Sequence, residues 1–233
     1  MSRSRSTVLA LAGFPAAFAL GCIPSARIVG RLKGGLDIEQ VGDHKPGAAN
    51  VTRSLGLGPG VATAAIDMTK GFTVATAARA AGGGPDLVGA LAATPVAAHI
   101  AVVRGRGAAA ALGAAFAIDP AATGIILAPI LGGTALKRAG VGVMVGALAF
   151  PLASLALGHR RRALWAASLP LLMAYGRLRG SDGDDTPLTA RVAWERFWFD
   201  RDPEVAASSA EAGADGPGMA GPPAPADAAA PSA

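Results

Sequence analysis

The sequence predicts an all-α integral membrane protein, a bundle of about six or seven transmembrane helices followed by a disordered C-terminal tail. Three observations support this fold class. The chain of 233 residues is 52% hydrophobic and only 16% charged, with a mean hydropathy of +0.42. Uncharged stretches recur along it, separated by short basic segments. Small residues fill those stretches, and they let helices pack closely where lipid supplies no hydrophobic drive between them.

The predicted spans follow the uncharged stretches in chain order. Because about 20 apolar residues cross the hydrocarbon core, residues 6–26 and 139–158 are each long enough to span. Each shorter stretch fits a tilted span, a half-helix or a buried core helix. These shorter stretches are residues 54–66, 87–103, 107–118, 120–136 and 163–176.

The N-terminal stretch has a second interpretation. Two arginines precede it and small residues end it, as in a cleaved signal peptide. Against that interpretation, the apolar character continues through Ile28 and Val29, and the remaining helices need a first helix to pack against. We therefore expect a retained helix.

The basic residues predict an orientation and argue against a nucleic-acid partner. The net charge is +5, but Lys and Arg lie in short loops between apolar runs, which is the orientation signal of a membrane protein. The first long loop is therefore placed in the cytoplasm; it contains Arg27, Arg31, Lys33, Lys45 and Arg53. On a seven-span count Arg104, Arg106, Lys137 and Arg138 return to that side, whereas residues 159–162 face outward. Either residues 107–136 cross the membrane once rather than twice, or the basic loop of residues 159–162 is an exception to the rule that basic loops face the cytoplasm.

The composition divides the chain into three parts. Residues 1–180 form the membrane-embedded domain, 181–205 a polar and aromatic segment, and 206–233 an Ala-, Pro- and Gly-rich tail expected to be disordered. Within residues 188–199, Trp194, Phe197 and Trp198 recur at helical spacing. This segment either lies in the membrane interface or docks its aromatic side chains on the bundle.

Two charges stand inside an apolar run. Asp67 and Lys70 are three residues apart, so on a helix they share one face and neutralise one another. They form either a functional site, since charges in membrane segments usually work or pair, or a structural ion pair near a helix end. Gly71 leaves room for close approach by backbone or ligand.

Three segments favour anion binding. Residues 42–53 supply turns, open amides and the guanidinium of Arg53, which suits phosphate, although Gly and Pro clusters alone are typical of a connecting turn. Residues 104–107 are basic and flexible and begin a helix. His99 lies near them, as a proton carrier or as a structural residue. With a single cysteine, Cys22, no disulfide within the chain is possible, and no metal-ligand spacing or Walker-type loop occurs.

These residues resemble a known family, the bacterial acyl-phosphate-dependent glycerol-3-phosphate acyltransferases. Residues 21–24 (GCIP) are similar to the family's GSIP. Residues 42–53 are similar to its GSGNxGAxNVxR, with Gly47, Asn50 and Arg53 in place. Asp67, Lys70 and Gly71 match its DxxKG at the family's spacing. The family's GHxxP…GGKG region is represented by His99 and by Arg104, Gly105, Arg106 and Gly107.

The resemblance implies the reaction and its residues. It implies transfer of a fatty acyl group from acyl phosphate to glycerol 3-phosphate, with no metal or cofactor, by a multi-pass protein of the bacterial plasma membrane that contacts membrane lipids. The active site is expected on the cytoplasmic side. The catalytic residues implied are Arg53, Lys70, His99 and Arg106. The substrate-binding residues implied are Gly47, Asn50, Asp67, Gly71, Gly105 and Gly107.

The chain departs from the family at several positions. Asp43, His44 and Lys45 replace Ser, Gly and Asn, Arg106 replaces Lys, and the closing His and Asn motif is reduced to residues 171–180 (LLMAYGRLRG). Two functions therefore remain open beside each other: a divergent acyltransferase, and a catalytically inactive relative that binds lipid precursors or a partner. A small anion carrier ranks last, since no internal repeat is evident.

Overall fold

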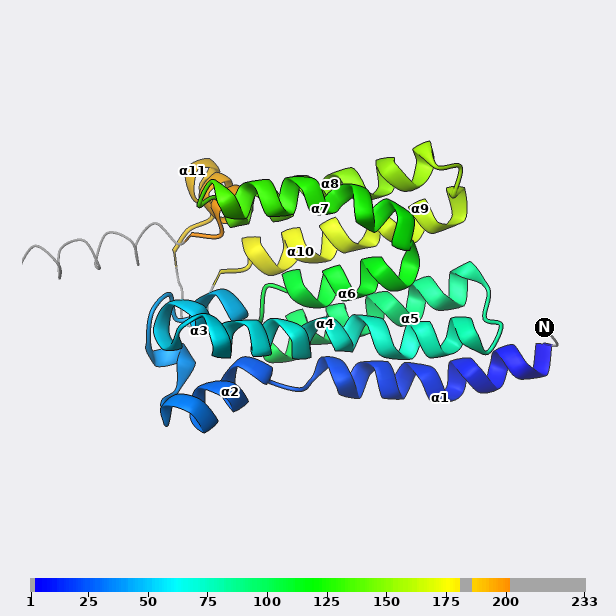
Figure 1. Ribbon diagram of the computed structural model, residues 1–233, viewed down its shortest axis with the longest axis horizontal. Coiled ribbons are helices and arrows are strands. Elements are labelled where there is room, and N and C mark those ends of the chain that lie inside the picture. The colour runs from blue at the N-terminus through cyan, green and yellow to red at the C-terminus, as the bar shows by residue number, and fades with distance from the viewer. Residues whose placement is uncertain (1–2, 181–185, 202–233) are drawn as a thin grey trace, which may run out of the picture.

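The computed structural model describes residues 3–180 and 186–201, and within them it contains helices and no strand (Figure 1). The predicted all-α class is confirmed. The α-helices are α1 (Arg3–Gly21), α2 (Ser25–Gly34), α3 (Ala48–Leu55), α4 (Leu57–Ala80), α5 (Pro85–Ala98), α6 (Ala108–Ile118), α7 (Pro120–Ala135), α8 (Ala139–Ala156), α9 (Arg160–Ala166), α10 (Ser168–Leu178) and α11 (Ala190–Trp194). Three short turns complete them, the 3₁₀ turn η1 (Ile38–Gln40) and the π-helical turns η2 (His99–Val103) and η3 (Glu195–Phe199).

The longer helices run side by side along the long axis and alternate in direction (Figure 1). One end, the loop end, carries α2, α3, residues 104–107, residues 136–138 and α11. The opposite end, the far end, carries the start of α1, residues 81–84, Asp119 and residues 157–159. Since α6 and α7 run in opposite directions, residues 107–136 traverse the bundle twice. The basic residues 159–162 therefore lie at the far end, opposite residues 104–107 and 136–138.

Acidic side chains at the far end pair with that basic loop. The Asp119 carboxylate lies 2.7 Å from His159 Nδ1 and 3.7 Å from Arg162 Nη1, and Asp86 lies 2.9 Å from Arg161. Asp119 also caps α7 by accepting a hydrogen bond from the Ala122 backbone N–H. Two carboxylates thus pair with three of the four side chains of residues 159–162.

Among the described residues, two helical segments are long and apolar enough to cross a membrane, Pro85–Val103 and Ala139–Ala156. A third span results if Thr7–Gly21 and Ser25–Gly34, bent by 42°, count as one. The stretch expected at residues 139–158 thus forms a helix of the length and composition that a span needs. The predicted stretch 87–103 forms one helical segment, because α5 continues without a break into η2. Helices α6 and α7 are apolar but shorter, so the count of six or seven spans stays a prediction.

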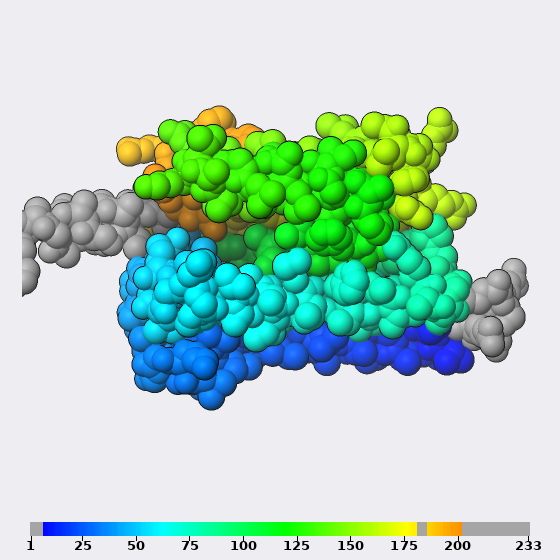
Figure 2. All heavy atoms as spheres, viewed as in Figure 1, coloured from blue at the N-terminus to red at the C-terminus, as the bar shows by residue number. Residues whose placement is uncertain are grey.

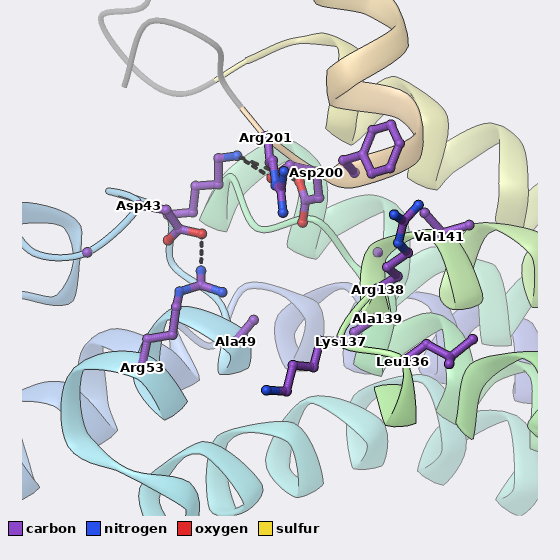
Figure 3. Close-up of a pocket in the computed structure, with 14 residues that line it drawn as sticks. Asp43, Ala49, Arg53, Leu136, Lys137, Arg138, Ala139, Val141, Asp200 and Arg201 are labelled. Atoms are coloured by element: carbon purple, nitrogen blue, oxygen red, sulfur yellow. Dashed lines mark hydrogen bonds and ion pairs between the residues drawn. The ribbon is translucent and has the colours of Figure 1, made fainter. Parts of the chain in front are cut away.

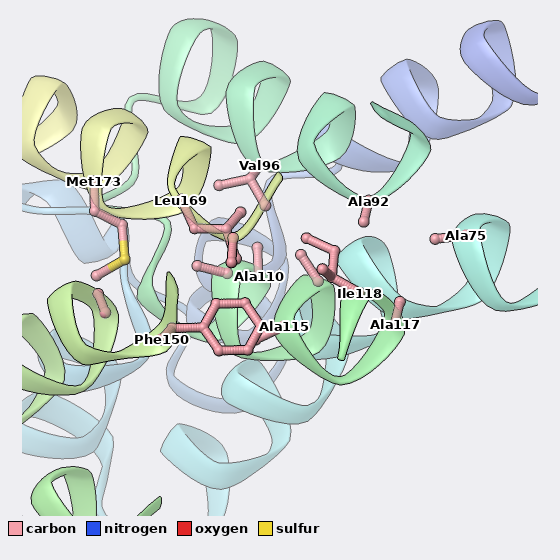
Figure 4. Packing of buried hydrophobic residues seen from close by; sticks show 14 of the residues in the cluster. Ala75, Ala92, Val96, Ala110, Ala115, Ala117, Ile118, Phe150, Leu169 and Met173 are labelled. Atoms are coloured by element: carbon pink, nitrogen blue, oxygen red, sulfur yellow. The ribbon is translucent and has the colours of Figure 1, made fainter. Parts of the chain in front are cut away.

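Small residues bring the helices into close contact. A Cβ on Gly71 of α4 would lie 2.3 Å from the Ala110 carbonyl oxygen of α6, and one on Gly113 of α6 would lie 1.9 Å from the Met68 carbonyl oxygen. Only glycine fits at these two positions. Farther along the core, the ring of Phe150 from α8 lies beside Ala115 (Figure 4).

The aromatic segment docks on the loop end. Arg177 of α10 donates to the carbonyl oxygen of Phe197 at 2.6 Å, and Phe197 and Trp198 pack against the core. Trp194 points outward and is 59% exposed. The structure therefore supports docking of two of the three aromatic side chains on the bundle, and contact with a membrane interface stays a prediction. The whole tail expected to be disordered, residues 206–233, lies outside the described residues, as do residues 181–185 and 202–205.

Candidate active site

Asp67 and Lys70 form the centre of a buried group, the inner cluster, made of Ser25, Asp67, Lys70 and His99. The break between α1 and α2 brings the carbonyl of Ile23 and the hydroxyl of Ser25 against α4. Lys70 Nζ donates to Asp67 Oδ1 at 2.5 Å, to the Ile23 carbonyl at 2.6 Å and to Ser25 Oγ at 3.2 Å. Ser25 Oγ in turn donates to Asp67 Oδ1. Only 1% of Lys70 is exposed, so its three N–H donors are used inside the protein.

His99 connects the inner cluster to the loop of residues 104–107. Its Nδ1 lies 3.4 Å from Lys70 Nζ and 4.0 Å from Asp67 Oδ1. Its other nitrogen faces Gly105, where an added Cβ would lie 2.2 Å from Nε2. The loop begins at Arg104, whose φ of 65° ends the helix, and it turns again at Gly107, with φ of 75°. His99 therefore sets how closely this loop approaches α5.

Arg106 points from this loop toward the loop end of the bundle. Its Nη1 donates to the carbonyl oxygens of Gly176 and Arg177, at 2.6 and 2.8 Å, at the end of α10. Its Nε lies 3.1 Å from Asp200 Oδ1. The loop that carries Arg106 therefore contacts the inner cluster, whereas the Arg106 side chain contacts the end of α10 and Asp200.

The first loop is built around Asn50. Its buried Nδ2 donates to the carbonyls of Ile38, Val41 and Lys45, at 2.8, 2.9 and 3.1 Å, and its Oδ1 accepts from the Asp43 backbone N–H at 3.2 Å. Four backbone groups of the loop are therefore held by one side chain, and Asn50 supports the loop from inside. Gly47 precedes α3 in an extended conformation, and a Cβ there would meet nothing within 4 Å.

A cavity of about 690 Å³, the outer pocket, opens between this loop, the α7–α8 turn and the end of η3 (Figure 3). Figure 2 shows the hollow between the cyan residues of α3 and α4 and the green and orange segments above them. The lining contains five cationic side chains and two carboxylates. The cations are Lys45, Arg53, Lys137, Arg138 and Arg201, and the carboxylates are Asp43 and Asp200. An anionic ligand suits such a lining.

Both carboxylates are engaged by cations. Arg53 Nη2 donates to Asp43 Oδ2, and the Arg53 side chain remains 55% exposed. Burial raises the pKa of the Asp43 carboxyl above its ordinary value, although Arg53 and Lys45 act in the opposite direction. Lys45 Nζ donates to the Asp200 carbonyl oxygen at 3.0 Å and lies 3.7 Å from its carboxylate. Lys45 is only 6% exposed beneath these contacts.

The predicted site residues therefore fall into two neighbouring groups. Asp67, Lys70, His99 and Gly105 belong to or contact the inner cluster, while Arg53 lines the outer pocket, and Arg106 reaches Asp200, which lines it. Sequence reasoning noted Lys45, Lys137 and Arg138 as orientation signals but missed them as pocket residues, and it missed Asp200 and Arg201 altogether. Within residues 3–180 and 186–201 no three His, Cys, Asp or Glu residues form a group able to hold a metal ion.

Comparison with known proteins identifies relatives of this chain. The family model described as glycerol-3-phosphate acyltransferase matches residues 11–179. A glycerol-3-phosphate acyltransferase of Thermus thermophilus is 35% identical over 167 residues, covering 68% of this chain and 80% of the relative. Glycerol-3-phosphate acyltransferase 4 of Dehalococcoides mccartyi is 29% identical over 205 residues, covering 81% and 87%.

Solved structures show the same fold. The glycerol 3-phosphate form of PlsY (YgiH), an integral membrane glycerol 3-phosphate acyltransferase, superposes with a TM-score of 0.66 at 29% identity, covering 72% of this chain and 88% of that one. The lysophosphatidic acid form of the same enzyme gives a TM-score of 0.65 at 27% identity, covering 73% and 88%. Similarity to an integral membrane protein confirms the predicted all-α membrane fold.

Proposed function

Because the chain belongs to the glycerol-3-phosphate acyltransferase family, we propose that it transfers a fatty acyl group from acyl phosphate to glycerol 3-phosphate and so forms lysophosphatidate for phospholipid synthesis. The observation that carries this proposal is the basic outer pocket, with the motif residue Arg53 in its wall. The motif residue Arg106 borders the pocket through Asp200. Both substrates carry a phosphate, and a cavity lined by guanidinium and ammonium groups suits them.

The reaction requires little covalent chemistry from the protein. The 1-hydroxyl oxygen of glycerol 3-phosphate attacks the acyl carbonyl carbon, the new ester bond forms, and the carbon–oxygen bond to phosphate breaks. Inorganic phosphate leaves and the hydroxyl proton passes to it or to water. Acyl phosphate is already activated, so no protein nucleophile is needed. Arg53 and Arg106 hold phosphate and offset charge that develops on the carbonyl oxygen.

The inner cluster serves this site indirectly. Lys70 is sealed from the pocket and its donors are used, so it acts by holding Asp67 and the break after α1. His99 positions Gly105, and through it the backbone amides of residues 105–107 and the side chain of Arg106. Gly47 leaves the amides at the start of α3 open to a ligand, and Asn50 fixes the loop that presents them. Gly71 lets α4 approach α6 and keeps the two halves of the site together.

We place the active site on the cytoplasmic side of the bacterial plasma membrane. Arg27, Arg31, Lys33, Arg53, Arg104, Lys137 and Arg138 belong to segments at the loop end. Basic residues in short loops mark the cytoplasmic side of a membrane protein. At the far end, His159, Arg161 and Arg162 pair with Asp86 and Asp119.

Acyl-phosphate-dependent formation of lysophosphatidate by the purified full chain tests the function. We expect product from the wild type and from Arg161→Ala, a charge change at the far end. Arg53→Ala and Arg106→Ala should reduce kcat/KM at least a hundredfold, since each removes charge-assisted bonds to phosphate. Absence of product from well-folded wild type, with an active family member as the positive control, contradicts the proposal.

A second function, a relative that binds lipid precursors without turnover, is favoured by one observation. Asp43 stands where the family has Ser, and its carboxylate holds Arg53. This alternative predicts that glycerol 3-phosphate raises the melting temperature of the wild type while no lysophosphatidate forms. The two measurements together separate the two functions.

A further inference from the structure

The described residues 186–201 lie outside the segment that matches the family model, residues 11–179, yet they reach the site. Thr189 starts α11 by accepting a hydrogen bond from the Val192 backbone N–H. Backbone carbonyls then fix the segment to α10, as Arg177 donates to Phe197 and Arg196 donates to Leu178 at 3.3 Å. This anchoring carries η3 to the mouth of the outer pocket, where Phe199, Asp200 and Arg201 form part of the wall (Figure 3).

Asp200 ends this segment in a conformation that presents its carboxylate to the site. Its φ of 55° turns the chain sharply after η3, a left-handed conformation that Asp tolerates better than most residues. The carboxylate lies 3.1 Å from Arg106 Nε and 3.7 Å from Lys45 Nζ. Two cations that come from separate loops therefore meet on one carboxylate of the C-terminal segment.

Because of these contacts, few donor groups of Arg106 and Lys45 remain available to a substrate. Arg106 also donates to the carbonyls of Gly176 and Arg177, and Lys45 is buried beneath Asp200. A phosphate dianion offers more charge and more acceptor oxygens than one carboxylate, so it can replace Asp200 on both cations. Arg201, Lys137 and Arg138 line the same cavity and supply further positive charge beside it.

We propose that Asp200 is an internal anion that occupies the phosphate subsite, so that the phosphate of glycerol 3-phosphate binds by displacing it and the end of the C-terminal segment opens and closes the site. This inference rests on the proposed function, because it takes glycerol 3-phosphate as the ligand of Arg106 and Lys45. The anchors at Phe197 and Leu178 do not involve Asp200. The tip therefore moves while α11 stays docked.

Asp200→Asn in the full chain tests the proposal by removing the internal charge and keeping the shape. A competing docked state that holds about 90% of the molecules weakens apparent affinity tenfold. We therefore expect the variant to bind glycerol 3-phosphate, measured by calorimetry on purified protein, with about tenfold lower Kd and to show a similar fall in KM at unchanged kcat. Inorganic phosphate is the second probe and should gain affinity in the same direction. Asp86→Asn, the same change at the far end, should leave Kd and KM unchanged.

Each outcome decides a different point. An unchanged or weaker Kd in Asp200→Asn overturns the proposal, and so does a fall in kcat at unchanged Kd, which makes Asp200 part of the reacting site. Tighter binding without turnover in wild type and variant upholds displacement but contradicts the acyltransferase function. Should the variant fold poorly by thermal melting, wild-type tryptophan emission provides the second measurement. Glycerol 3-phosphate should shift it, because Trp198 lies two residues from Asp200, and no shift at saturating ligand counts against displacement.

Discussion

The inner cluster and the outer pocket both combine basic side chains with carboxylates, but they differ in how far the basic groups are exposed. In the inner cluster, Lys70 is 1% exposed and three acceptors of the protein use its three donors. In the outer pocket, Arg53 is 55% exposed and shares the lining with Lys137 and Arg138. The protein neutralises Lys70 with its own acceptors, whereas the outer pocket holds five cations for two carboxylates and so keeps positive charge for an anionic ligand. We therefore expect Lys70 to support the site without touching substrate.

Of the variants that test this comparison, Lys70→Met should have the largest effect on stability and activity. It leaves Asp67 buried without its cation, which costs about 3–5 kcal/mol where one partner of a buried pair is removed. We expect a steep fall in melting temperature and loss of acyl transfer, measured by thermal unfolding and by product formation. The double variant Lys70→Met, Asp67→Asn should regain much of the lost stability. A stable single variant with only a raised KM would instead make Lys70 a substrate ligand.

Gly105→Ala tests the link between the two regions. The added Cβ would lie 2.2 Å from His99 Nε2, so the loop that carries Arg106 must move. A displacement of about 1 Å costs roughly a hundredfold in rate, and we expect kcat/KM to fall by that order. Gly124→Ala in α7 is the matched control, because its Cβ meets nothing within 4 Å. Equal kinetics for the two variants would show that His99 does not position the loop.

Arg53→Lys acts on the outer pocket alone. The charge stays, but the two-pronged geometry toward phosphate is lost. We expect KM for glycerol 3-phosphate to rise about tenfold, equivalent to about 1.4 kcal/mol, with a melting temperature close to wild type since the side chain is half exposed. Steady-state kinetics and thermal unfolding measure both. A large loss of stability with unchanged KM would instead show that Arg53, like Lys70, supports the fold rather than binds substrate.

The fold was largely predictable from the sequence, and the site only in part. Apolar stretches and glycine content predicted a helical membrane bundle, because both respond to the lipid environment directly. The motifs indicated Arg53, Lys70, His99 and Arg106, but spacing along the chain does not say which cation the protein itself neutralises. Ile23 and Ser25, which do this for Lys70, are brought in by the break after α1. Asp200 was out of reach, since only the docking of α11 and η3 brings it to Arg106.

A substitution at the far end should have the smallest effect on catalysis, and it contrasts with those at the loop end. Burial alone would raise the pKa of Asp119, but hydrogen bonds from His159 and from the Ala122 backbone N–H hold it below its ordinary value. A carboxyl with a lowered pKa stabilises the fold above its unfolded value of about 3.9, and this contribution is lost as the pH falls through the lower folded value.

Asp119→Asn should therefore lower the melting temperature at neutral pH and narrow its gap to wild type below about pH 4. KM for glycerol 3-phosphate should not change, because Asp119 lies at the far end and is not part of the lining of the outer pocket. Thermal unfolding across pH, with kinetics at neutral pH, checks both parts. A changed KM would mean that the two ends of the bundle are coupled, and the loop end could then not be treated as an independent site.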